Sequence, residues 1–253
     1  MAFTRRLRIA LWTVALTGPP LLYLRSYIRR LEQKYPPLPP DLFTTLACRT
    51  PRQEGQRTPY VDVYGARVPI SSLLASDKRS GRHTAPITSH NEPSLEELWS
   101  RSFISSRAMR LEGALVKGGP LLPDDVAENG FRLGQSLLGG ILHVLRTPSA
   151  GSPLLAEWHM PSHVTGFFER IAAWGYPWRL MDGGRHEWSV QQTDDGEVEV
   201  RFAAAHDYKV VQEEGSAGKI IPRWVLRLHR AYARFLLDEV VEQLRAQAIE
   251  KET

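Results

Sequence analysis

The stretch RHEWSVQQTDDGEVEVRFAAAHDYKVV, residues 185–211, determines the fold that the sequence predicts. Two runs of strand-forming residues flank the turn residues 194–196, and a short Asp/Gly turn between such runs is a strong signal for a β-hairpin. In the second run, charged residues alternate with Val198, Val200 and Phe202. This alternation predicts a strand with one wet and one buried face, as antiparallel sheets have.

The rest of the chain alternates between helix signals and strand signals. Ser94 with Glu97 has the spacing of a capping box, which predicts a helix that runs to a Gly-Gly-Pro stop at 118–120. A long C-terminal helix is predicted from about Pro222, because proline suits the first helical position. The other predicted elements are strands at 60–70, 131–139, 140–147 and 154–160, a polar loop at 77–93 and a short helix at 166–174. This mixture predicts an α+β fold.

Residues 1–33 are predicted to be an N-terminal membrane anchor or a targeting helix. Their apolar run, 9–24, has sixteen residues, fewer than the roughly 20 that span a bilayer, but extension through Ile28 makes a span possible. A mitochondrial presequence is the main alternative, since no acid precedes Glu32, and a cleaved secretion signal is a third. A Pro-rich linker at 34–59 and a folded domain at 60–250 follow.

The basic charge of the chain is concentrated at its N-terminus. Residues 1–34 contain seven basic residues and one acid, a net charge of +6, so the other 219 residues of the +4 chain sum to −2. A nucleic-acid-binding domain needs a basic surface on its folded body. We therefore expect no nucleic-acid partner and a membrane contact through the N-terminal segment.

Motifs of common enzyme classes are absent from the sequence. The chain has no P-loop, no dinucleotide-binding glycine turn, no nucleophile elbow and no HExxH zinc motif. A lone cysteine, Cys48, excludes an intrachain disulfide and any multi-cysteine metal site. His159 and His163 have a spacing that would suit a metal on a helix, but Pro161 lies between them. We expect neither a metal nor a cofactor.

Two histidines are the candidate catalytic residues. If the hairpin closes at the turn 194–196, His186 pairs with Ala204, and His206 lies one pair beyond. Both would then stand at one end of the sheet, with Glu187 and Asp207 as available partners. Histidine titrates near neutral pH, so the two side chains could act as general acid and base. The alternative is that both are hydrogen-bonded residues at strand ends.

Large aromatic residues are the candidate ligand-binding groups. Tryptophan combines a large apolar area with one hydrogen-bond donor, so it can line a ligand cavity, but it is also an ordinary core residue. In the strand that begins at Arg185, His186 and Trp188 fall on the same face. The candidate ligand-binding residues are Trp158, Trp178, Trp188 and Tyr232.

Four arginines recur along one side of the predicted C-terminal helix, at positions 223, 227, 230 and 234. Two interpretations remain open for this row. Arginine stems often cover apolar surface on a solvated face. Alternatively, the row could contact membrane phosphates or an anionic ligand.

The order of elements resembles the START-like, or helix-grip, superfamily. The segments that carry the resemblance are LLAEWHM at 154–160, HEWSV at 186–190, VEVRFAAAHDY at 198–208 and the helix that begins PRWVLRLHRAY at 222. The last of these segments is similar to the terminal helix of uncharacterised polyketide-cyclase-like and lipid-binding-like domains. YPWRLMDGGRHEWSV at 176–190 resembles uncharacterised membrane-anchored fungal proteins found in natural-product gene clusters. The resemblance implies a curved antiparallel sheet wrapped around a long C-terminal helix and an apolar cavity.

Three functions fit this sequence. The first is a membrane-anchored protein that binds a hydrophobic small molecule and assists a cyclase-like or isomerase-like step in polyketide or terpenoid biosynthesis, with His186 and His206 as acid–base groups. The second is a non-catalytic carrier of a lipid or metabolite at a membrane. The third is a structural protein whose cavity is filled by its own side chains.

Overall fold

The computed structural model describes residues 19–20, 22–79, 93–193, 195–215 and 218–252 in two compact units, 1–36 and 37–253. In the first unit, residues 22–34 are helical. None of the helices within the described part of the chain is long and apolar enough to cross a membrane. Most of the apolar run expected to form an anchor lies outside the described residues.

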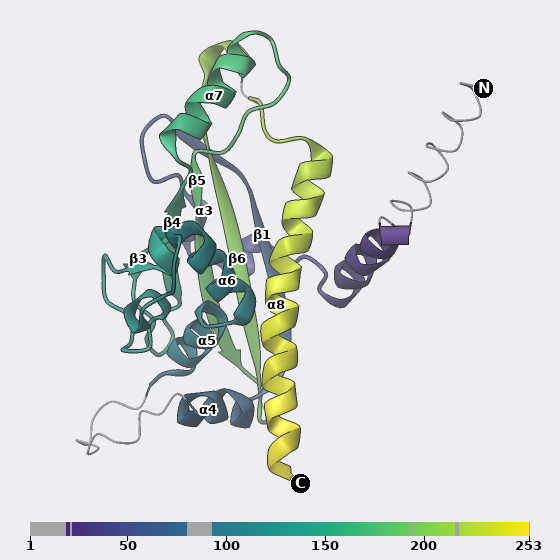
Figure 1. Ribbon diagram of the computed structural model, residues 1–253, viewed down its shortest axis with the longest axis vertical. Coiled ribbons are helices and arrows are strands. Elements are labelled where there is room, and N and C mark those ends of the chain that lie inside the picture. Colours follow the sequence, from purple (N-terminus) through teal and green to yellow (C-terminus); the bar gives the residue numbers. More distant parts are fainter. Residues whose placement is uncertain (1–18, 21, 80–92, 194, 216–217, 253) are drawn as a thin grey trace. The chain divides into compact units, whose positions relative to one another are not determined.

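The second unit is built on a six-stranded antiparallel sheet with the strand order β1-β6-β5-β4-β3-β2 (Figure 1). A long C-terminal helix, α8, runs alongside β1 and β6. The sequence prediction of an α+β fold with an antiparallel sheet and a C-terminal helix is therefore confirmed. The strands are β1 (Gln56–Pro69), β2 (Ser136–Leu137), β3 (Leu142–Arg146), β4 (Leu154–His159), β5 (Gly183–Gln192) and β6 (Glu197–Lys209).

The hairpin of β5 and β6 has the register that the turn predicted. His186 pairs with Ala204, and His206 pairs with Gly184. Successive side chains of a strand point to opposite faces, so this register places His186 and His206 on the same face of the sheet. We call it the histidine face, and the opposite face, which carries Arg185, is the ion-pair face.

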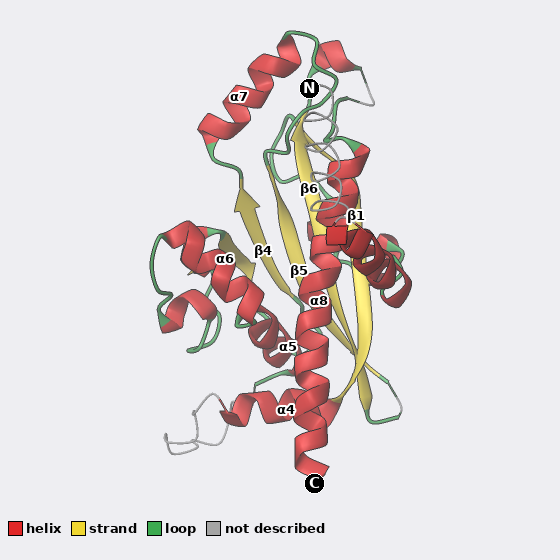
Figure 2. Ribbon diagram, turned by 45° about the vertical axis from the view of Figure 1, so that its right-hand side comes forward, coloured by secondary structure: helices red, strands yellow, loops and turns green. Residues whose placement is uncertain are grey.

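Helices cover the two faces of the sheet (Figure 2). Helices α5 and α8 contact strands on the histidine face, where Phe103 of α5 packs against Phe202 of β6. Short helices α2 and α3 lie on the ion-pair face, where Cys48 joins a buried apolar cluster with Val63 and Ala203. The helices of the second unit are α2 (Pro40–Phe43), α3 (Leu46–Arg49), α4 (Ile70–Arg79), α5 (Leu95–Ile104), α6 (Arg107–Lys117), α7 (Ser162–Ala173) and α8 (Arg223–Glu252).

The helix expected from Ser94 is divided into α5 and α6. Ser94 caps the first helix by accepting a hydrogen bond from the backbone N–H of Glu97, as predicted. The backbone is extended at Ser106, whose hydroxyl caps α6 by accepting from the N–H of Met109. A capping serine satisfies donors that a continuous helix would use internally, so it favours a new start. Gly118, with a φ of 71°, ends α6 in the left-handed conformation at the predicted stop.

Two local predictions differ from the structure. The strand expected at 131–139 is reduced to the two residues of β2, followed by a short 3-10 turn at 138–140. A Gly-Gly pair such as 183–184 is typical of a tight turn, but these two residues are the first residues of β5. They are needed there because strands approach closely: a Cβ on Gly184 would lie 2.0 Å from the carbonyl oxygen of Ala205.

Residues 34–59, expected to be a linker, have structure of their own. The backbone N–H of Leu38 donates to the carbonyl of Val63, and helices α2 and α3 contact the strands. Strand β1 then begins at Gln56, four residues before the predicted start of the domain. From Pro37 onward, this segment therefore packs against the sheet.

The core of the histidine face is an aromatic cluster. Phe103 lies at its centre, with ring centroids 4.7 Å from Phe202, 5.5 Å from Trp99 and 5.7 Å from Trp188. The indole N–H of Trp99 donates to the backbone carbonyl of Arg201 at 2.9 Å. Full burial of such a side chain contributes about 1.5–3 kcal/mol, so this cluster is a major anchor of α5 on the sheet.

Candidate functional site

The candidate site is a group of three histidines between the sheet and α8. The Nε2 atoms of His206 on β6 and His229 on α8 lie 2.6 Å apart, a hydrogen-bond distance. His186 lies on the same face of the sheet on the neighbouring strand. The structure thus brings the two predicted histidines to one face and adds a third.

His229 was missed by sequence reasoning, although a signal for it exists. It stands four residues from Val225 and from Ala233, and these positions lie on the side of α8 that is turned toward the protein. A histidine in phase with the buried residues of an amphipathic helix faces the core. Tracing this stripe together with the strand parity of His206 would have paired the two side chains.

Aromatic rings enclose the histidines. The ring of Tyr60 on β1 stacks on His206 with centroids 4.8 Å apart, and Trp158 on β4 meets the same imidazole edge-on at 6.2 Å. Trp158 also lies 6.2 Å from His186. The phenol oxygens of Tyr60 and Tyr208 are 3.5 Å apart, and burial raises the pKa of both hydroxyls. The surroundings are therefore apolar, with neutral polar groups at fixed places.

The three imidazoles are neutral at physiological pH. Burial, with a smaller contribution from His229, lowers the pKa of His186 to about 3. Burial also lowers the pKa of His206 well below its ordinary value, and the neighbouring His229, His186 and Arg230 lower it further. The pKa of His229 is lowered mainly by burial, with Asp62 opposing the shift and Arg230 adding to it. Burial thus prevents protonation, because the imidazolium loses its hydration.

Several buried polar atoms of this group have no hydrogen-bond partner within the described residues. They are Nδ1 of His186, Nδ1 of His206 and the indole Nε1 of Trp158. Buried polar groups in proteins are nearly always hydrogen-bonded, so each exception requires an explanation. Nε1 of the neighbouring Trp188, in the aromatic core of the same face, also has no partner among the described residues. The three atoms around the histidines are therefore the candidate positions for hydrogen bonds to a molecule outside the chain.

Two arginines of the row on α8 contact strand β1, and the other two are exposed. Nε of Arg230 donates to Oδ1 of Asp62 on β1 at 2.8 Å. Arg234, 6% exposed, lies 4.2 Å above the ring of Tyr64. Both side chains attach α8 to β1, so this part of the row is not the solvated face that one interpretation expected. Arg223 and Arg227 are exposed at the beginning of the helix.

The other predicted ligand-binding residues lie apart from the histidines or behind them. Trp188 is fully buried in the aromatic cluster, with its centroid 5.8 Å from His186. Trp178 packs edge-on against Tyr176 in the loop that precedes β5. The hydroxyl of Tyr232 on α8 donates to Oε2 of Glu112 on α6 at 2.6 Å, so it connects two helices.

Glu187 and Asp207, expected as partners of the histidines, point to the opposite face. They follow His186 and His206 in sequence by one residue, and strand alternation separates neighbours onto opposite faces. Asp207 instead accepts from the guanidinium of Arg185 and the hydroxyl of Thr58. Strand parity alone excludes both carboxylates from the histidine site.

A second carboxylate cluster stands on the same ion-pair face. Glu187 is 2% exposed and accepts from Arg146 at 3.0 Å and from the backbone N–H of Thr45 at 3.0 Å. The hydroxyl of Thr45 adds another hydrogen bond to the same carboxylate. Glu187 therefore holds the segment before α3 against the sheet.

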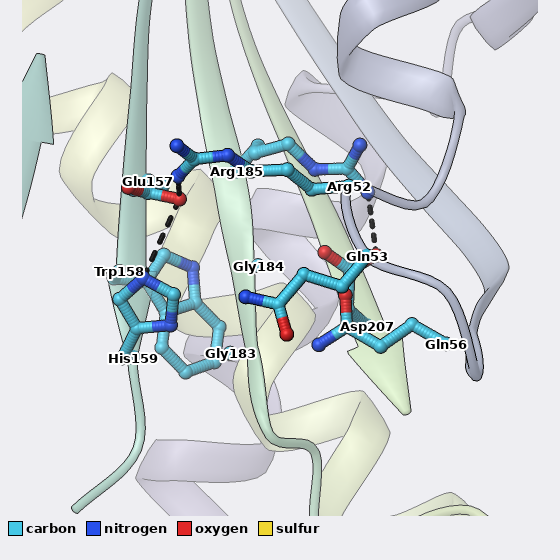
Figure 3. Close-up of a pocket in the computed structure, with 10 residues that line it drawn as sticks. All are labelled: Arg52, Gln53, Gln56, Glu157, Trp158, His159, Gly183, Gly184, Arg185 and Asp207. Atoms are coloured by element: carbon cyan, nitrogen blue, oxygen red, sulfur yellow. Dashed lines mark hydrogen bonds and ion pairs between the residues drawn. The ribbon is translucent and has the colours of Figure 1, made fainter. Parts of the chain in front are cut away.

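A small pocket opens on the ion-pair face beside Arg185 (Figure 3). Its lining combines Arg52 and Gln53 from the loop before β1 with Glu157 of β4 and Asp207 of β6. Arg52 and Glu157 form an ion pair, and His159 adds a second contact to Glu157 at 3.4 Å. The enclosed space holds about one water molecule, which is too little for a metabolite.

A metal centre is not assembled by the described residues. No group of three or more His, Cys, Asp and Glu side chains is arranged there to hold a metal ion. His159 ends β4 and His163 lies in α7, so the two do not share a helix face.

Comparisons with protein-family models, with curated proteins and with solved structures find no match for the chain.

Proposed function

We propose that the chain binds a largely apolar small molecule that carries hydrogen-bonding oxygen groups, at the histidine site. The observation that carries the proposal is the set of unpartnered buried atoms on His186, His206 and Trp158. Small-molecule sites combine mostly apolar walls with a few polar groups that fix orientation. Because the histidines are neutral, a ligand with carbonyl or hydroxyl oxygens suits them better than a charged one.

Accessible surface at His186 supports a space beside it. Burial lowers the pKa of His186 strongly, but the residue keeps part of its surface accessible. Its neighbours on the same strand, Arg185 and Glu187, are each only 2% exposed. Trp158 and Tyr60 are also only partly covered. We propose that the ligand binds in a recess beside these three partly exposed side chains.

The outer wall of this recess is proposed to be formed by α6 and α8. The contact of Tyr232 with Glu112 places the two helices side by side. Leu228 lies one turn before Tyr232 on α8 and is 43% exposed, and Leu111 and Leu115 of α6 are more exposed still. Apolar side chains that stay uncovered beside a buried polar site are typical of a ligand entrance.

The helix-grip arrangement remains our proposal for the fold family. In support, β1 precedes the helices α4, α5 and α6, the strands β2 to β6 follow in order, and β1 closes the sheet beside β6. The C-terminal α8 then covers the same face as the histidines. The resemblance implies a cavity at this place, between the sheet and the terminal helix.

Acid–base assistance of a cyclisation or isomerisation is the proposed reaction class. With a proton on Nε2 of His206, its Nδ1 has a free lone pair that can take a proton from the ligand. The Nε2 proton then moves to Nε2 of His229, 2.6 Å away, and the reverse transfers return a proton to another atom of the ligand. Asp62 favours the positive charge that arrives on His229.

A non-catalytic carrier of a lipid or metabolite is the second candidate, and one observation favours it. The low pKa of the histidines makes them weak bases, which is unfavourable for proton abstraction at neutral pH. Under this alternative the same atoms only orient the bound molecule. The membrane attachment through the N-terminal segment is proposed for both candidates.

The test is native mass spectrometry of the full chain, extracted in mild detergent from the cells that produce it. We expect a stoichiometric bound mass in the wild-type chain and its loss in His186→Leu and His206→Phe. The matched control is His159→Gln, an exposed histidine that should leave the bound mass in place. A wild-type chain that emerges without any bound mass would contradict the proposal.

A further inference from the structure

Exposed aromatic and apolar side chains gather at one end of the second unit. Phe167 of α7 is 53% exposed, Trp174 after it 83%, Val210 after β6 47% and Trp224 at the start of α8 63%. Figures 1 and 2 show these elements, α7, the end of β6 and the beginning of α8, at the same end of the sheet. We call this region the α7 end. A tryptophan with most of its surface in water is unusual in a core-forming domain.

The α7 end is a fixed scaffold. Nζ of Lys219 donates to the carbonyl of Ala172 at 2.9 Å, which joins the segment before α8 to α7. Lys209 at the end of β6 contacts Glu169 of α7 at 3.2 Å. The buried side chains of Arg179 and Glu214 form an ion pair at 2.6 Å, which connects the loop after α7 to the loop after β6. These contacts fix the positions of the elements that carry the exposed aromatic side chains.

Cations accompany the aromatic residues. Arg170 is exposed on α7, and Arg223 and Arg227 are exposed on the first turns of α8, on either side of Trp224 in sequence. Of the nearby acids, Glu169 and Glu214 bind Lys209 and Arg179, Asp182 is partly buried, and Glu213 is exposed. Arginine and tryptophan side by side are suited to the headgroup region of a bilayer, where an amphipathic ring and a phosphate-binding group both find partners.

We propose that the α7 end is a membrane-contacting surface that inserts Phe167, Trp174 and Trp224 into the headgroup region of an anionic bilayer. Arg170 and Arg223 would bind the lipid phosphates. An anionic membrane is favoured over a protein partner by this charge. This contact belongs to the folded body, so it is separate from the anchor expected in residues 1–33 and independent of the ligand proposed above.

The test uses the full chain in vesicles that contain phosphatidylcholine and phosphatidylserine in a ratio of about 7:3. A polarity-sensitive dye, NBD, is attached in Trp174→Cys at the α7 end. The matched control is Leu74→Cys, an exposed apolar position on α4, which Figure 1 shows at the opposite end of the sheet. Cys48 is buried and should not react with the dye.

We expect brominated phosphatidylcholine to quench the dye at position 174 and to leave the dye at position 74 unchanged. Charge reversal in R170E/R223E should weaken this contact by about 25-fold or more, because each of the two basic residues near an anionic surface contributes roughly a fivefold factor. Circular dichroism checks that each variant is folded. Equal quenching at both positions, or a blue-shifted dye at position 174 that brominated lipid does not quench, would overturn the proposal.

Discussion

The two faces of the sheet bury polar side chains in opposite ways. On the ion-pair face, the carboxylates of Glu187 and Asp207 each accept from an arginine and a threonine. On the histidine face, one strand position away, His186 and His206 are neutral and keep nitrogen atoms without partners among the described residues. The paired carboxylates attach segments of the chain to each other, while Nε of Arg185 on their face has no partner among the described residues. Neutral groups with open hydrogen-bonding capacity are what a ligand site needs.

The comparison also separates stability from function. A buried ion pair whose partner is removed leaves a charge in a low dielectric, so the effect on stability is large. A buried imidazole without a partner already lacks a hydrogen bond, so its loss removes little stability. The following predictions use this difference, beginning with the largest expected effect.

Breaking the ion-pair face should destabilise the fold strongly. Arg185→Met removes the guanidinium that contacts Asp207, Thr58 and the carbonyl of Ala47. We expect a loss of about 3–5 kcal/mol in the free energy of unfolding, because Asp207 remains buried without its cation. Urea unfolding followed by circular dichroism measures it. Arg67→Met is the control, since Arg67 forms an exposed pair and its loss should hardly move the midpoint.

Lowering the pH should destabilise the fold through the histidines of the histidine face. The pKa values of His186, His206 and His229 are lower in the folded chain than the ordinary value of 6.5, so the unfolded chain binds more protons as the pH falls. Stability is therefore highest above about pH 7 and decreases below about 6.5. At pH 5.5 the loss should be roughly 1–1.5 kcal/mol for each histidine that stays neutral. Unfolding of His206→Phe over the same pH range should show a shallower decrease; an identical decrease would contradict the assignment.

Removing a single open histidine should hardly change stability. His186→Leu deletes an imidazole whose Nδ1 has no partner and replaces it with an apolar side chain in an aromatic environment. We expect the free energy of unfolding at pH 7.5 to change by less than about 1 kcal/mol. Thermal unfolding with the bound molecule removed checks this. A loss comparable to that of Arg185→Met would mean that His186 is a structural residue.

The smallest effect on stability is expected for a side chain of α8 that contacts another helix and not the sheet. Tyr232→Phe removes the hydroxyl that donates to Glu112 on α6, at a position where Tyr232 is 39% exposed. A partly hydrated hydrogen bond of this kind contributes about 0.5 kcal/mol. Chemical unfolding should therefore give nearly the wild-type stability. A large change would show that the α6–α8 contact is a major support of the fold.

Much of the sheet could be predicted because its signals are local. The turn 194–196 fixes the register of β5 and β6, and this register alone places His186 and His206 on one face. The capping serine and the glycine stop predicted both ends of the α5–α6 segment. The break at Ser106 was missed, because a serine inside a helical pattern is ambiguous until its cap hydrogen bond is seen.

The site itself depends on contacts between distant segments, which local patterns do not contain. His229 approaches His206 only because α8 packs across the sheet, at a separation of 23 residues along the chain. Asp207 was expected to assist His206 because the two are neighbours in sequence, but the period of a strand separates them. Trp188 followed the same alternation as His186 and proved to be a core residue because α5 covers it.

Histidine ¹⁵N NMR of the full chain tests the central claim most directly, by comparing the protein as isolated with the protein after detergent exchange has removed any bound molecule. At pH 7 we predict neutral tautomers for His186, His206 and His229, with no titration near pH 6.5. The Nδ1 resonances of His186 and His206 should shift when the molecule is removed. Ordinary titration near pH 6.5, or identical spectra in both preparations, would contradict an open ligand site on the histidine face.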